Sequence, residues 1–153
     1  EMGKRFMAKT VAETIKKYQD PKIIKSALDG MKIAVVGMSS KQSRDSHKVG
    51  AYLKENGYKI YPVNPNETQI LDMKCYSSLL DIKDKIDVVN VFREASAVPQ
   101  VAYDSIKIKA EFMWLQLGVI NQEGIKIATK KGINCIVDLC IKIEHARYIG
   151  NSN

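Results

Sequence analysis

The chain has 153 residues, of which 45% are hydrophobic, and its 24 basic and 17 acidic side chains give a formal net charge of +7. This length suffices for one folded domain with its own core, and this composition excludes collagen and intrinsic disorder. No apolar run approaches the ~18 residues that a membrane span needs, and the start of the chain has no apolar secretory segment, so we expect a cytoplasmic protein that binds no membrane.

The first 30 residues predict a helical extension. Segments 8–18 and 21–28 have the apolar spacing of amphipathic helices, with Pro21 in a first helical turn and Gly30 after the second helix. Residues 1–32 contain eight basic and four acidic side chains, so +4 of the net charge lies there. Because the rest of the chain is only mildly basic, we expect no nucleic-acid partner.

From residue 31 onward, short apolar segments alternate with segments of helical spacing. The apolar segments are continuously hydrophobic, as strands buried on both faces of a parallel sheet are. They lie at 32–37, 58–63, 86–91, 111–116 and 134–138, and the helical segments lie at 46–56, 98–108 and 122–131. The alternation predicts an α/β fold, namely a Rossmann-like, doubly wound five-stranded parallel sheet. We expect this domain to span residues 31–149, with residues 1–30 packed on it and 150–153 as a tail.

An open parallel sheet binds its ligand outside the carboxyl ends of the strands. After the first strand, Gly37, Ser39 and Ser40 form a loop of small residues that leads to a helix start near Ser46. Hydroxyls, backbone N–H groups and a helix N-terminus suit a phosphate group. The complete G-x-G-x-x-G spacing is absent, so an ordinary strand-to-helix turn stands as an equal alternative.

The second strand ends in Val63, Asn64 and Pro65. A cofactor of the NAD type normally meets an acidic residue at this place, whereas Asn64 is uncharged. This rigid corner suits an adenine better than a ribose diol, and a plain proline-rich turn is the alternative.

The third and fourth strands end in further candidate groups. Phe92 and Arg93 end the third strand, and a guanidinium is a natural bidentate partner for phosphate. A salt bridge of Arg93 with Glu94 or Asp87 is equally open. The fourth strand ends in Gln116, a polar group that either faces the ligand or ties down a loop from a buried position.

Five stretches of the sequence carry a resemblance when they are taken together. They are A-V-V-G-M-S at 34–39, G-Y-K-I-Y-P-V-N-P at 57–65, D-V-V-N-V-F-R at 87–93, W-L-Q-L-G-V at 114–119 and C-I-K-I-E-H-A-R at 140–147. They resemble the small stand-alone CoA-binding proteins, which are similar to the N-terminal CoA-binding domain of the succinyl-CoA synthetase alpha subunit. The resemblance implies a Rossmann-like domain that binds coenzyme A across the carboxyl edge of the sheet.

The resemblance also implies roles for individual residues. The first loop and the helix start would hold the pyrophosphate, the second strand end would line the adenosine, and the third would close the crevice. Gln116 and Gly118 would flank the pantetheine path, and basic groups suit a ligand with several phosphates. The expected CoA-binding residues are Gly37, Ser39, Ser40, Arg44, Ser46, Lys48, Val63, Asn64, Pro65, Phe92, Arg93, Gln116 and Gly118.

The chain offers few groups for catalysis or metal binding. Its cysteines, Cys75, Cys135 and Cys140, form no C-x-x-C pair, so neither a disulfide framework nor a metal site is expected. Cys140 and His145 resemble a nucleophile and its base by their proximity, but structural roles in a buried setting are favoured for both. His47, beside the expected phosphate site, is expected to be an exposed loop residue.

The sequence thus predicts a module that binds CoA or an acyl-CoA and has no catalytic machinery of its own. A second copy of the chain or another protein is a conceivable partner. Two alternatives stand beside this hypothesis: a subunit of an acyl-CoA synthetase-type enzyme that needs a partner chain, and an NAD(P)-binding regulatory protein.

Overall fold

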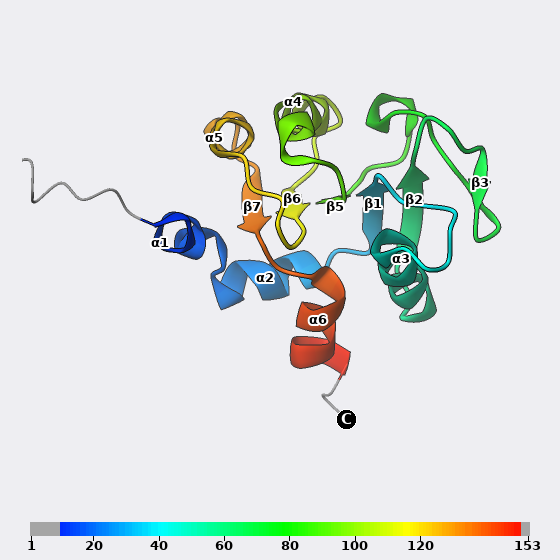
Figure 1. Cartoon of the computed structure of the whole chain (residues 1–153), viewed down its shortest axis with the longest axis horizontal. Helices are drawn as coiled ribbons and strands as arrows, with labels where there is room; N and C mark the ends of the chain where they lie inside the picture. The colour runs from blue at the N-terminus through cyan, green and yellow to red at the C-terminus, as the bar shows by residue number, and fades with distance from the viewer. Residues whose placement is uncertain (1–9, 151–153) are drawn as a thin grey trace, which may run out of the picture.

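A computed structural model describes residues 10–150 and shows a central sheet of five parallel strands (Figure 1). The strands are β1 (Lys32–Val36), β2 (Lys59–Val63), β5 (Val88–Val91), β6 (Phe112–Leu115) and β7 (Asn134–Val137). They pair in the order β2-β1-β5-β6-β7. The predicted α/β fold and all five predicted strands are therefore confirmed, with small differences at the strand ends.

Helices cover both faces of this sheet (Figure 1). On one face lie α4 (Val98–Lys107) and α5 (Gln122–Lys130), and on the other lie α2 (Pro21–Leu28), α3 (Asp45–Glu55) and α6 (Ile141–His145). The helices predicted at 21–28, 46–56, 98–108 and 122–131 are all present, each within one residue of its predicted bounds. None of the helices within residues 10–150 has both the length and the hydrophobicity of a membrane span.

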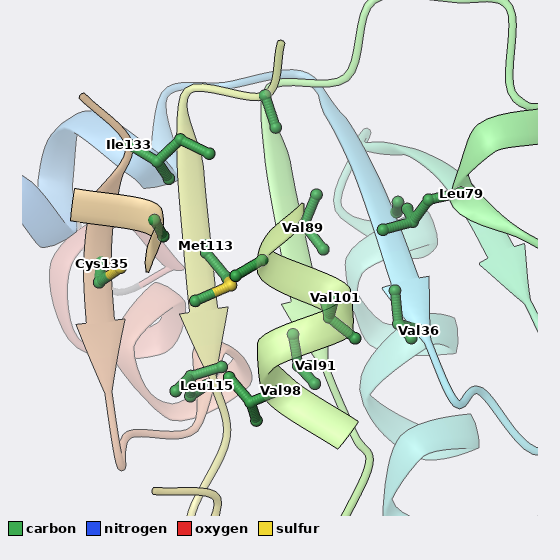
Figure 2. Close-up of a cluster of buried hydrophobic side chains, with 14 of the residues drawn as sticks. Val36, Leu79, Val89, Val91, Val98, Val101, Met113, Leu115, Ile133 and Cys135 are labelled. Atoms are coloured by element: carbon green, nitrogen blue, oxygen red, sulfur yellow. The ribbon is translucent and has the colours of Figure 1, made fainter. Parts of the chain in front are cut away.

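Alternate residues of the strands pack into two separate hydrophobic clusters, one on each face. Figure 2 shows the first cluster, in which Val89 and Met113 of the sheet lie under Val98 and Val101 of α4. The second cluster contains the fully buried Trp114, whose Nε1 donates to the Leu139 carbonyl at 2.8 Å. Because both faces are buried, the strands need apolar residues at nearly every position, which explains their continuous hydrophobicity.

The N-terminal helices pack against the same two clusters. The segment predicted at 8–18 is described from residue 10, and it forms α1 (Val11–Ile15) and a 3₁₀ turn, η2 (Lys16–Tyr18). Ile15 is buried in the first cluster, and Ile24 and Leu28 of α2 are buried in the second. Both N-terminal helices thus contribute side chains to the hydrophobic clusters of the sheet. Most of the predicted tail at 150–153 lies outside the described residues.

Several short elements were not predicted. Between β2 and β5 the chain forms a hairpin, β3 (Gln69–Ile70) and β4 (Met73–Lys74), and a 3₁₀ turn, η3 (Leu79–Asp81). A second 3₁₀ turn, η4 (Ala95–Ala97), precedes α4, and a π-helical turn, η5 (Ala146–Gly150), follows α6. After the hairpin, the Tyr76 N–H donates to the Pro62 carbonyl at 2.9 Å, which brings this insertion against the outer edge of β2.

The strand order sets the place of a crevice. From β1 the chain first adds β2 on one side and then crosses to β5, β6 and β7 on the other. In such sheets, ligands bind outside the carboxyl ends of the strands where the winding reverses. That point lies between β1 and β5.

Candidate functional site

A cleft of about 1130 Å³ opens at the carboxyl ends of β1, β2 and β5. Its position coincides with the reversal of the winding, as expected for an open α/β sheet. The predicted site residues that line it are Gly37, Ser39, Arg44, Ser46, Val63, Asn64, Pro65, Phe92 and Arg93. The first three strand ends of the sequence analysis are therefore brought together in one place.

Gly37 lines the cleft directly after β1 and lies against Phe92, which follows β5. Its φ is +86°, and a Cβ at this position would lie 2.3 Å from the Phe92 carbonyl oxygen. Its N–H donates to the Val63 carbonyl of β2 at 2.8 Å. Both the left-handed conformation and the close approach require glycine. Gly37 thus joins the ends of three strands.

The loop after Gly37 is held against the first turn of α3. The Ser39 N–H donates to Oγ of Ser46 at 2.9 Å, and Nδ1 of His47 donates to the Ser39 carbonyl at 2.8 Å. The expectation that His47 is an exposed loop residue is wrong: it lies in α3 and is only 6% exposed. The buried ring fixes the loop through its hydrogen bond with the Ser39 carbonyl.

The N-terminus of α3 opens onto the cleft. Arg44 precedes the helix as its cap residue and makes no side-chain capping hydrogen bond, and Arg44, Asp45 and Ser46 all line the cleft. The first N–H groups of a helix carry partial positive charge and attract anions. A phosphate placed here would meet this helix end and the Arg44 guanidinium together.

Both ends of the Asn64 side-chain amide already form hydrogen bonds within the protein. Its Nδ2 donates to the Met38 carbonyl at 2.9 Å, and its Oδ1 accepts from the Asn66 N–H at 2.9 Å. The amide therefore links the end of β2 to the loop after β1. Pro65 follows Asn64 directly and lines the same cleft.

Arg93 forms one of the two salt bridges that the sequence leaves open. Its Nη2 and Nε donate to one carboxylate oxygen of Glu94, at 2.6 Å and 3.0 Å. Asp87 has a different role, because its Oδ2 accepts from the Met31 and Lys32 N–H groups, both at 2.9 Å. Both members of the Arg93–Glu94 pair line the cleft.

Acidic residues also line the cleft, which the sequence analysis did not foresee. Asp45, Glu94 and Asp104 are present beside Arg44 and Arg93. Asp104 accepts a hydrogen bond from Nε2 of Gln100 at 3.0 Å. The lining is thus of mixed charge, and any attraction for an anion depends on local groups rather than on a uniformly basic surface.

Two predicted residues near the first loop are outside the lining of this cleft. The Ser40 hydroxyl donates to Oε2 of Glu67 at 2.7 Å on the exposed surface. Lys48 is exposed on α3, one turn beyond Arg44.

The two predicted residues at the end of β6 are also outside the lining. Gln116 is 3% exposed, and its Nε2 donates to Oδ1 of Asn90 at 2.6 Å. Gly118 has a φ of +79°, and its N–H donates to Oδ1 of Asp138 at 2.7 Å. Both follow β6, which is one strand removed from the point where the winding reverses.

Several lining residues are not among the predicted site residues. They are Ser43, Asn66, Ser77, Ser78, Leu79, Ala97, Gln100 and Val101, together with the three acidic residues above. Ser77 and Ser78 reach the cleft because Tyr76 pairs with Val63 of β2. The sequence holds no signal for this pairing, because the segment after β2 lacks both helical and strand periodicity.

The two residues that suggested a nucleophile and base lie elsewhere. His145 is 3% exposed, and its Nδ1 forms a hydrogen bond with the Tyr52 hydroxyl at 2.8 Å. Burial lowers the pKa of His145 below its usual 6.5. Cys140 precedes α6 as its cap residue. Neither residue lines the cleft.

The remaining cysteines are also unsuited to reactive chemistry. Burial raises the pKa of Cys75 and raises that of Cys135 to about 12, so both remain thiols near neutral pH. Within residues 10–150, no group of three or more His, Cys, Asp or Glu side chains is placed to hold a metal ion.

Comparisons with known proteins agree with the fold. A family model described as a CoA binding domain matches residues 31–146. YneT of Bacillus subtilis is 43% identical over 115 residues, which cover 75% of this chain and 85% of YneT. The structure of a hypothetical protein from Pyrococcus horikoshii OT3 has a TM-score of 0.83 at 38% identity, covering 86% of this chain and 93% of that one. The ADP-forming acetate–CoA ligase II of Archaeoglobus fulgidus is 44% identical over 71 residues, 45% of this chain and 10% of the ligase.

Proposed function

The chain belongs to the CoA-binding domain family, and we propose that it binds coenzyme A, or an acyl-CoA, in the cleft between β1, β2 and β5. The observation that carries this proposal is the cleft's position at the reversal of the winding, where the Gly37 loop and the N-terminus of α3 face the same space. This combination is the usual setting for a dinucleotide-like ligand in doubly wound folds.

The pyrophosphate of CoA would bind at the N-terminus of α3. The positive end of the helix favours an anion there, and Arg44 adds a full charge on the same side. Because Oγ of Ser46 already accepts the Ser39 N–H, its own hydroxyl proton remains available for a phosphate oxygen. Lys48, further along α3, would add a weaker, longer-range attraction.

The adenosine would lie toward the end of β2, and the pantetheine arm would leave toward β6. Val63 and Pro65 offer an apolar surface beside the rigid Asn64 corner. In the other direction, Gln116 and Gly118 lie beyond the cleft lining along the same sheet edge. The arm would therefore run across the end of β5 toward the exposed Gly118, since Gln116 is buried and bonded to Asn90.

We further propose that this site binds its ligand without covalent chemistry. Among the described residues, the cleft lining includes no cysteine or histidine that would act as a nucleophile or general base. The buried His145 packs between Tyr52 and Tyr58 instead. These positions support a carrier or sensor of CoA rather than an acyl-transfer enzyme.

A second candidate is the CoA-binding part of a larger synthetase. The similarity to the Archaeoglobus fulgidus acetate–CoA ligase favours it, because the matched segment is only a tenth of that ligase. Affinity purification from native extract separates the two candidates. Recovery of a stoichiometric partner chain together with acyl-CoA ligase activity favours the second, and a chain recovered alone and without this activity favours the first.

Isothermal titration calorimetry with CoA and NAD tests the primary proposal. We expect CoA to bind and NAD to show no measurable heat of binding at the same concentration. Arg44→Gln should weaken CoA binding about fivefold or more, because it removes a charge at the expected pyrophosphate position. Lys48→Gln is the matched control on the same helix and should change affinity by less than about twofold. Absence of CoA binding to the unmodified chain, or tighter binding of NAD, would contradict the proposal.

A further inference from the structure

The Arg93–Glu94 ion pair occupies the position where the third strand meets the cleft. Two guanidinium nitrogens of Arg93 contact the same Glu94 oxygen, at 2.6 Å and 3.0 Å. The side chains are 42% and 61% exposed and both line the cleft, so a ligand can reach either one. A guanidinium engages carboxylate and phosphate through the same donors. Glu94 therefore uses donors of Arg93 that an anionic ligand would need.

We propose that Glu94 is an internal competitor for Arg93 and sets the affinity of the cleft for its phosphate-bearing ligand. This inference rests on the proposed function, since it concerns the same site. When a phosphate group approaches, Arg93 can exchange the Glu94 carboxylate for the phosphate oxygens. Breaking the pair and the repulsion between Glu94 and the ligand both reduce the net free energy of binding. The affinity for the ligand is therefore lower than it would be without the Glu94 carboxylate.

The pair is suited to such an exchange because it is weak and exposed. Adjacent exposed ions form a modest interaction that salt screens, so its loss is readily compensated by a ligand with more than one negative charge. Asp104 provides the contrast within the same cleft. It also carries a negative charge, but it accepts from Gln100 and contacts no guanidinium in the described part of the chain.

A double-mutant cycle measures the competition directly. The CoA dissociation constant is determined by calorimetry for the unmodified chain, Glu94→Gln, Arg93→Gln and the double variant. We expect Glu94→Gln to bind CoA about threefold to tenfold more tightly, because Arg93 is released and one repulsive charge is removed. In the Arg93→Gln background, the same substitution should gain less than about twofold, since there is no guanidinium to release. Asp104→Asn is the control for charge alone and should gain less than Glu94→Gln.

The outcomes separate this inference from the proposed function. If the unmodified chain binds CoA and Glu94→Gln binds it equally or more weakly, the competition is refuted while the binding site stands. Equal gains with and without Arg93 likewise refute it, because they indicate general repulsion. If neither the unmodified chain nor Glu94→Gln binds CoA, the proposed function itself fails. Unchanged thermal unfolding of all variants shows that the differences arise at the exposed cleft and not from loss of the fold.

Discussion

At the scale of single residues, Gly37 has the strictest requirement in the site. Its left-handed φ disfavours any side chain, and the Phe92 carbonyl leaves no room for a Cβ. We expect Gly37→Ala to lower the free energy of unfolding by about 3 kcal/mol, from backbone strain and overpacking together. Gly132→Ala is the matched control, because Gly132 also has a φ of +86° but nothing lies within 4 Å of its Cβ position. It should cost only about 1–2 kcal/mol in urea unfolding, and equal losses would refute a steric role for the Phe92 carbonyl.

Individual site residues differ in whether the sequence predicts them. Gly37, Asn64 and Arg93 were found because each lies within two residues of the end of a recognisable strand, and parallel strands bring their carboxyl ends to one edge. Glu94 was considered only as a salt-bridge partner, and Asp104 was missed because it reaches the cleft from within α4. Its presence there depends on how α4 packs on the sheet, which a local pattern does not specify.

At the scale of elements, His145 attaches α6 to α3. Its ring contacts the rings of Tyr52 and Tyr58, and it forms a hydrogen bond with the Tyr52 hydroxyl. Because burial lowers the pKa of His145 in the folded chain, the unfolded chain takes up a proton first as the pH falls. The contribution of His145 to stability is therefore complete above its unfolded pKa, near 6.5, and is lost progressively below it.

Urea unfolding between about pH 7.5 and about pH 5.5 tests this attachment. The unmodified chain should lose more stability over this range than His145→Gln, which has no proton to take up at that position. Parallel pH profiles of the two proteins would show that His145 does not contribute to the acid sensitivity.

The long helices and the sheet strands are predicted by the sequence, whereas the short hairpin is not. The long helices and buried strands were predicted because their periodicity extends over several turns or a whole apolar run. The β3–β4 hairpin was missed because its two turn residues, Leu71 and Asp72, have φ values of +51° and +62° without the Asn-Gly signal of such turns. Contacts from elsewhere support it instead, since Nζ of Lys54 in α3 donates to the Leu71 carbonyl at 2.9 Å.

At the scale of the whole molecule, the strand order determines where the cleft opens. The winding reverses between β1 and β5, and the largest part of the predicted site lies there, whereas the residues after β6 fall outside it. The sequence predicts parallel strands but not their order, which is why the ends of the first four strands were all included. The formal net charge of +7 also says little about the site, because the cleft carries both arginines and carboxylates.

A ligand that binds only the folded chain must stabilise the whole molecule. CoA at about 100 times its dissociation constant should raise the unfolding free energy by about 2.7 kcal/mol, and the midpoint of thermal unfolding by about 5–10 °C. NAD at the same concentration should leave the midpoint unchanged. Differential scanning fluorimetry measures both, and equal shifts with the two ligands would contradict selectivity for CoA.

The proposed place of CoA is between the Gly37 loop and the N-terminus of α3. A crystal structure of the chain with CoA decides this point, because it shows both occupancy and orientation. We predict the pyrophosphate next to Arg44 and Ser46, the adenosine toward Pro65, and the Arg93 guanidinium turned from Glu94 to a phosphate oxygen. CoA bound at another surface, with this cleft empty and the Arg93–Glu94 pair intact, would show that the proposed site is wrong.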